Sequence, residues 1–216
     1  MGETLTAQQV RNEAVAAMGT ELGEIYHSLG DQVAWLHLKW DTFCELFAER
    51  DTVELLNSAA PAYFHELQRQ TWEDVFLHLC RVTDPPLSAG KSNLTLRRLP
   101  DLVSDQTFRT NLNALVDDAV VKTTFARDWR NRRLAHTELN RSQPLASASR
   151  KHVEDAMAAI RLVLNQLEQH YLNKTVSYEH TIPDLGGVAS LIRVLRKGVE
   201  ARRAEREAKL RGHVVA

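Results

Sequence analysis

Hydrophobic residues recur every three or four positions along most of this chain, which is the spacing of helices that bury one face. The pattern is strongest where Phe64, Trp72 and Phe76 fall on one stripe. No stretch alternates polar and apolar residues for long enough to indicate a sheet. The pattern predicts helices over residues 5–28, 32–50, 51–56, 62–83, 105–136, 150–173 and 188–211.

Residues that break or cap helices separate these segments. Gly30-Asp31 is expected to interrupt the first helical pattern, and Asp84-Pro85-Pro86 is expected to end the helix over 62–83, because proline cannot continue a helix. Ser104 or Asp105 can cap the next helix, and Ser147 or Ser149 the one after a proline-containing loop.

These elements predict an all-α protein, an antiparallel helical bundle of four to five main helices with a charged C-terminal helix. The expected division is an N-terminal helix over 1–30, the bundle over 31–175, and a linker with a basic helix over 176–216. No apolar run is long enough to span a bilayer and no secretory signal is visible, so we expect no membrane association and a cytoplasmic protein.

The formal net charge of −1 conceals an uneven distribution. Residues 1–90 carry 14 acidic and 5 basic side chains, whereas residues 91–216 carry 14 acidic and 22 basic ones. A polyanionic partner would therefore meet the second part of the chain. The alternative is that opposite charges face each other across the helices of one bundle.

The sequence carries no recognised pattern for a metal or a nucleotide cofactor, so we expect neither. The nine histidines include no His-Glu-x-x-His, and Glu24 and His27 form a lone Glu-x-x-His pair. A Gly-rich phosphate loop and a Cys-x-x-Cys pair are also missing. Cys44 and Cys80 lie among apolar residues and are predicted to be buried free thiols.

The stretch from Phe125 to Asn140 is unusually rich in arginine for a helix of a bundle. Its cationic and polar residues are too dense for a wholly buried helix, so part of this face is exposed or meets a partner. A solvated basic face is one interpretation, and a site for an anion is the other. The residues concerned are Arg127, Arg130, Asn131, Arg132, Arg133 and His136.

Arg130-Asn131-x-x-x-x-His136 resembles the Arg-x(4–6)-His motif of HEPN domains, including the polar residue after the arginine. Two further stretches resemble the abortive-infection, AbiU-type branch of that superfamily: Phe64 to Gln68 leading to Leu79–Pro85, and Asn93 to Leu96. The resemblance covers roughly residues 30–170. It implies a HEPN-like bundle.

The resemblance also implies a metal-independent endoribonuclease, a toxin or phage-defence effector that acts as a homodimer on RNA. Arg130 and His136 would then be catalytic, with Asn131 orienting them, and Arg127, Arg132 and Arg133 would bind RNA. An antitoxin or a nucleotidyltransferase is the partner that such proteins suggest. The alternatives are a non-catalytic HEPN module that binds RNA or nucleotide, and a helical scaffold whose motif is coincidental.

Helix geometry sets a condition on this site. Residues six apart on a regular helix point about 120° away from each other, so Arg130 and His136 do not meet by periodicity alone. A helix end near Thr137, the length of the side chains, or a second copy of the motif across a twofold axis would be needed to complete the site. Arg132 and Arg133 share a face with His136, and their charge is expected to lower its pKa.

The C-terminal helix is the second basic region. Residues 193–211 hold 8 basic and 3 acidic side chains. This helix is either an arm that contacts RNA or docks an antitoxin, or a solvated, salt-bridged helix end.

Overall fold

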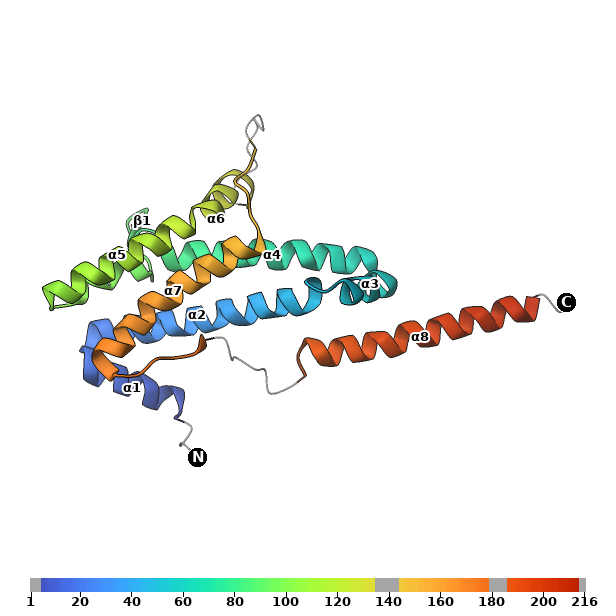
Figure 1. Ribbon diagram of the computed structural model, residues 1–216, viewed down its shortest axis with the longest axis horizontal. Helices are drawn as coiled ribbons and strands as arrows, with labels where there is room; N and C mark the ends of the chain where they lie inside the picture. The colour runs from blue at the N-terminus through green and yellow to red at the C-terminus, as the bar shows by residue number, and fades with distance from the viewer. Residues whose placement is uncertain (1–4, 135–143, 179–185, 214–216) are drawn as a thin grey trace. The chain divides into compact units, whose positions relative to one another are not determined.

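The computed structural model describes residues 5–134, 144–178 and 186–213 and confirms the all-α fold class (Figure 1). The chain divides into two compact units. Unit 1 comprises residues 1–37 and 74–180, and unit 2 comprises residues 38–73 and 181–216. Two long helices, α2 (Thr20–Phe47) and α4 (Pro61–Thr83), contribute residues to both. The expected division at residues 30 and 175 stays a prediction.

Unit 1 contains most of the helical bundle. Helices α5 and α7 pack along each other in opposite directions, and α1 also contacts α7 (Figure 1). A short hairpin, whose two strands have two residues each, and two 3-10 turns connect α4 to α5. Besides its parts of α2 and α4, the elements are α1 (Ala7–Met18), β1 (Leu87–Ser88), β2 (Lys91–Ser92), η1 (Leu96–Arg98), η2 (Pro100–Leu102), α5 (Gln106–Lys122), α6 (Thr124–Trp129), η3 (Arg130–Leu134) and α7 (Arg150–Leu172).

The expected interruption at Gly30-Asp31 is wrong, because α2 runs through it and the break lies at Gly19. Gly19 adopts a φ of +84°, which glycine tolerates without a steric penalty, and its N–H closes the end of α1 on the Val15 carbonyl. Gly23 then lets α1 approach α2 closely, since a Cβ there would lie 2.6 Å from the Val15 Cα. Gly30 stays helical beside the ring of Tyr178.

The core of unit 1 forms where the hydrophobic periodicity predicts it. On α7 the expected face is buried, and Ser149 caps this helix by accepting a hydrogen bond from the His152 N–H. One carboxyl group also lies in this core: Glu168 is 1% exposed and accepts a hydrogen bond from the Tyr26 hydroxyl. Burial raises the pKa of Glu168 above its ordinary value. The buried α7 residues include Val153, Met157, Ile160, Val163, Leu164 and Leu167.

Unit 2 joins α3 (Arg50–Ala59) to the first part of α8 (Val188–His213). Leu46, Leu56 and Phe64 form its small core, against which residues 188, 192 and 195 of α8 pack. Arg202 donates hydrogen bonds to the carbonyls of Ser58 and Ala59, which the end of α3 leaves without helical partners.

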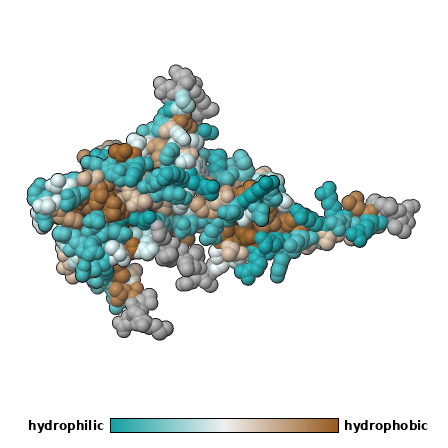
Figure 2. Space-filling model, viewed as in Figure 1, coloured by the Kyte–Doolittle hydropathy of each residue, from teal (hydrophilic) through white to brown (hydrophobic). Residues whose placement is uncertain are grey.

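Beyond that contact α8 is a charged, solvent-facing helix. Residues 200–211 are exposed, and Figure 2 shows mostly hydrophilic residues along the second half of the helix. None of the described helices combines the length and the apolar character needed to cross a lipid bilayer.

Candidate functional site

The described part of the arginine-rich stretch lies on two successive backbone elements, α6 and the turn after it, rather than on one helix. The prediction of a single helix from residue 105 to 136 is wrong: Asp105 caps α5 as expected, but α5 ends at Lys122. Thr123 interrupts it with φ −96° and ψ 5°, while its hydroxyl donates to carbonyls of the preceding turn. The short helix α6 follows, and residues 130–134 form a π turn. Such turns occur frequently at functional sites.

Arg127 fixes this break to the end of α4. Its Nη2 donates to the Thr83 carbonyl at 2.8 Å and to the Thr83 hydroxyl at 2.7 Å, and its Nη1 donates to the Val120 carbonyl and the Thr123 hydroxyl at 3.0 Å each. The side chain is 18% exposed. Burial lowers the pKa of Arg127, although an arginine keeps its charge at neutral pH. Arg127 therefore has a structural role: its guanidinium joins the end of α4 to the break between α5 and α6.

Arg130 lies one helical turn later and meets a carboxylate instead. Its Nη1 donates to both oxygens of Asp84, at 2.8 and 2.7 Å, and its Nε donates to the Asn131 side-chain oxygen at 3.1 Å. Burial is the largest single effect and lowers the pKa of Arg130, but the hydrogen bond to Asp84 together with the electrostatic interactions with Cys80 and Asp84 raises this pKa overall. Within the described residues, its Nη2 donates no hydrogen bond, so this edge of the guanidinium can take an anion.

Asp84 is the functional residue that sequence reasoning missed. It follows the last residue of α4 and lies 46 positions before Arg130, so no local spacing links the two. In the sequence, Asp84 stands out only as part of the helix-ending Asp84-Pro85-Pro86 and of the stretch Leu79–Pro85 that resembles the AbiU-type branch. A carboxylate at a helix end followed by two prolines, in a chain with an arginine-rich segment elsewhere, is the signal that would have suggested the pair.

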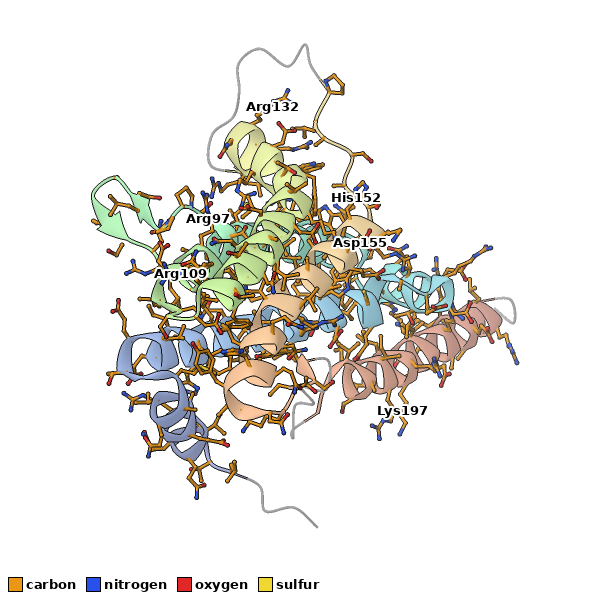
Figure 3. All side chains as sticks on the ribbon, turned by 60° about the vertical axis from the view of Figure 1, so that its left-hand side comes forward. Arg97, Arg109, Arg132, His152, Asp155 and Lys197 are labelled. Carbon is orange, nitrogen blue, oxygen red and sulfur yellow. The ribbon has the colours of Figure 1, made fainter. Side chains whose placement is uncertain are left out.

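Residues next to Arg130 also form hydrogen bonds with the backbone of residues 144–146, which precede α7. Asp128 accepts a hydrogen bond from the Ala146 N–H at 2.7 Å, and the Trp129 indole donates to the Ala146 carbonyl at 2.9 Å. Arg132 donates to the Pro144 carbonyl at 3.1 Å and lies at the end of this region in Figure 3. The Arg133 guanidinium lies 5.5 Å from the Trp129 ring centre in a cation–π contact and is exposed.

His136 lies outside the described residues. The expected angle of about 120° between the Arg130 and His136 side chains assumed a regular helix. Residues 130–134 instead form a π turn, in which hydrogen bonds span five residues instead of four, so that assumption does not hold. The described chain brings Arg130 and Asn131 together, with Asn131 exposed, and places Arg132 and Arg133 within the same turn.

Cys80 lies in the buried face of α4 near these arginines. Burial raises the pKa of its thiol to about 11, although the charges of Arg130 and Arg127 oppose that effect. The thiol is therefore protonated at neutral pH and is a poor nucleophile. Cys80 is free and buried as predicted, whereas Cys44 is free but only half-buried.

A pocket of about 340 Å³ lies beside the Arg130–Asp84 pair. It is lined by Asp84 with Arg81 and Val82 of α4, by Gln32 of α2, and by Asn93 and Leu94 after the hairpin. In the described part of the chain, no group of three or more histidine, cysteine, aspartate and glutamate side chains is arranged to hold a metal ion.

Comparison with known protein families gives one result. The model of the family described as AbiU2, of HEPN domains, matches residues 19–192. No curated protein and no solved structure gives a significant match to the chain.

Proposed function

The chain belongs to the AbiU2 family of HEPN domains, and on this premise we propose that it is an endoribonuclease in which Arg130 and His136 are the catalytic residues. The family match covers more than half of the chain and includes every residue of the proposed site. The abortive-infection branch of the superfamily was the one expected from the sequence. The proposed biological role is that of a toxin or defence effector.

The fixed position of Arg130 is the observation that carries this proposal. Arg130 is 27% exposed and Asp84 20%, so the pair is partly shielded from solvent while one edge of the guanidinium stays available. A guanidinium held in this way can donate from its remaining nitrogen, Nη2, to a phosphate oxygen. A merely solvated arginine would have to lose side-chain freedom before binding one.

In the proposed reaction His136 acts as the general base. It removes the proton from a ribose 2′-hydroxyl, whose oxygen attacks the adjacent phosphorus, and the bond from phosphorus to the 5′-oxygen breaks. A protonated histidine returns a proton to that leaving oxygen, so the products are a 2′,3′-cyclic phosphate and a 5′-hydroxyl. Arg130 stabilises the charge that develops on the phosphorane.

Asp84 would serve as a positioning residue. By accepting both bonds from Nη1 it fixes the plane of the Arg130 guanidinium, and Asn131 accepts from Nε on the other side. This arrangement orients the arginine before the substrate arrives, which is the condition under which an electrostatic contact contributes most to catalysis.

The further RNA contacts are assigned to the exposed end of the same segment. Arg133, exposed against the Trp129 ring, and Arg132 beside Asp128 are proposed to bind phosphates. Arg127, also predicted from the sequence to bind RNA, already donates four hydrogen bonds within the fold, so we assign it the smallest share of RNA binding.

The direct test is incubation of the purified full chain with end-labelled RNA in the presence of a chelator. We expect cleavage that leaves a cyclic phosphate, and we expect the variant His136→Ala to lose it. The control is His65→Ala in α4, since His65 is exposed and lies outside the proposed site. Equal cleavage by wild type and His136→Ala would overturn the assignment.

We further propose that the active form is a homodimer with a site composed of Arg130 from one protomer and His136 from the other. Mixing inactive Arg130→Ala with inactive His136→Ala would then rebuild one complete site in each mixed dimer. After subunit exchange, about a quarter of wild-type activity is expected, since half of the dimers are mixed and each has one site. If cleavage is not recovered although light scattering shows dimers, Arg130 and His136 of one site belong to the same protomer.

A non-catalytic HEPN module is the second candidate, favoured by the fact that Asp84 already neutralises Arg130. Such a module would bind RNA or nucleotide, or pair with an antitoxin or nucleotidyltransferase. RNA binding without cleavage by the wild type, unchanged in His136→Ala, would select this candidate.

A further inference from the structure

The pocket beside Asp84 contains polar groups that the fold does not use. Asn93 donates both of its amide hydrogens, to the Pro85 carbonyl at 2.7 Å and the Ser88 hydroxyl at 2.8 Å, which leaves its side-chain oxygen as an acceptor. Gln32 is half-buried, and among the described residues its amide makes no side-chain hydrogen bond. Arg81 is exposed at the same pocket.

The pocket also offers an apolar surface. Leu94 is an exposed large hydrophobic residue, 39% accessible, and Val82, which is buried, also lines the pocket. A volume of about 340 Å³ lies at the lower end of the range for small-ligand sites. A flat ring with a polar edge fits these walls better than an aliphatic chain, because the polar groups need partners once water is displaced.

The geometry points to a nucleobase, and we propose that this pocket binds a guanine of the RNA. Guanine offers acceptors at O6 and N7, which arginine recognises more often than any other base edge, and donors at N1 and N2. Arg81 and the Gln32 amide supply donors for the first pair, and the oxygens of Asn93 and Gln32 supply acceptors for the second. Adenine lacks the acceptor at position 6, and uracil and cytosine lack N7.

Asp84 connects this pocket to the cleavage site. Its carboxylate belongs to the pocket lining and accepts both bonds from Arg130. A base in the pocket would therefore lie one side chain away from the arginine that we assign to the scissile phosphate. The inference rests on the proposed function for its biological meaning, since the guanine would be a nucleotide flanking the cleaved bond.

Binding is tested separately from cleavage, with the four nucleoside 5′-monophosphates and the full chain in equilibrium dialysis. GMP is expected to bind about tenfold or more tightly than AMP, CMP or UMP. Gln32→Leu and Arg81→Met should each reduce GMP affinity to the level of UMP. The matched controls are Gln166→Leu on α7 and Arg203→Met on α8, both exposed and outside the pocket, with helical content checked by circular dichroism.

Asn93 is left unchanged in this test because its amide hydrogens hold the hairpin. Equal affinity for the four nucleotides, or unchanged GMP binding in both pocket variants, would overturn the inference. His136→Ala should bind GMP as the wild type does, whatever its effect on cleavage. RNA cleavage without GMP preference would refute the pocket alone, whereas GMP preference without cleavage would refute the proposed reaction alone.

Discussion

Two segments of this protein are equally rich in arginine and differ in almost everything else. Residues 127–133 hold four arginines, and residues 201–211 of α8 hold four arginines and one lysine. In the first segment Arg127 and Arg130 are 18% and 27% exposed and meet fixed partners at 2.7 to 3.0 Å. In the second, every residue is exposed, and Arg202 donates hydrogen bonds to the carbonyls of Ser58 and Ala59 at the end of α3.

The difference shows that a count of cations does not locate a site. A cation held by a partly buried partner keeps one geometry, which can be complementary to a transition state. A solvated cation attracts anions over a distance set by ionic strength, without regard to their shape. Substitutions in the two segments and at Asp84 are expected to separate these two kinds of cation.

Removal of Arg130 should have the largest effect. Arg130→Ala and His136→Ala are each expected to lower the rate of RNA cleavage by about a hundredfold or more, the range found for removal of a charge-stabilising donor or a general base. Arg203→Ala, the matched variant in α8, should change the rate less than twofold. The rates are measured as initial rates of cleavage of one labelled RNA. A similar loss of rate in Arg130→Ala and Arg203→Ala would show that a fixed and a solvated arginine contribute equally.

Arg127→Met should destabilise the fold rather than the reaction. The substitution removes four hydrogen bonds and leaves the Thr83 carbonyl without its donor, whereas the Val120 carbonyl keeps the Thr123 hydroxyl as a partner. We therefore expect the free energy of unfolding to fall by about 2–3 kcal/mol. Urea titration followed by circular dichroism measures the change. Arg203→Met should stay within about 0.5 kcal/mol of wild type. If both variants unfold at the same urea concentration, the hydrogen bonds of Arg127 do not stabilise the fold.

Asp84→Asn should have an intermediate effect on catalysis. The amide can accept only one of the two hydrogen bonds, so Arg130 loses its fixed orientation and kcat is expected to fall about tenfold. KM for RNA should stay constant or fall, because one negative charge has left the site. Asp84→Glu should restore part of kcat. A rise of kcat in Asp84→Asn would instead mean that the aspartate competes with the phosphate.

Neutralising the end of α8 should have the smallest effect. The double variant Arg203→Gln/Arg206→Gln is expected to change the cleavage rate less than twofold at physiological salt, because these side chains face solvent. Its effect on RNA affinity should appear only in the salt dependence. The slope of the logarithm of RNA affinity against the logarithm of salt concentration should fall by about 2 at most. A tenfold loss of cleavage at physiological salt would make α8 part of the site.

The sequence predicted helices well where one face is continuously apolar. The helix from Arg150 to Leu172 and its buried face follow from periodicity and from Ser149 as a cap. Glycines gave poorer guidance, because their effect depends on packing: Gly19 ends a helix, while Gly30 remains helical beside Tyr178. Local patterns do not encode that contact, which joins residues nearly 150 positions apart.

The site was predictable only in part, because local patterns do not encode contacts between residues far apart in the sequence. Arg130 and Asn131 stand out by residue type, and the structure places them side by side. The partner of Arg130 is a distant carboxylate, and the division of labour between Arg127 and Arg130 arises from which group each meets at the end of α4. A sequence reports the arginines but not the groups that hold them.

The π turn over residues 130–134 has a consequence for how such a motif can change length. A π turn contains one residue more per hydrogen-bonded turn than an α-helix, in which each residue turns the chain by about 100°. Deleting a single codon here would let the turn revert to α-helix while Arg130 kept its contact with Asp84. A one-codon insertion or deletion in the motif would then be absorbed by the backbone of this turn without moving Arg130 away from Asp84.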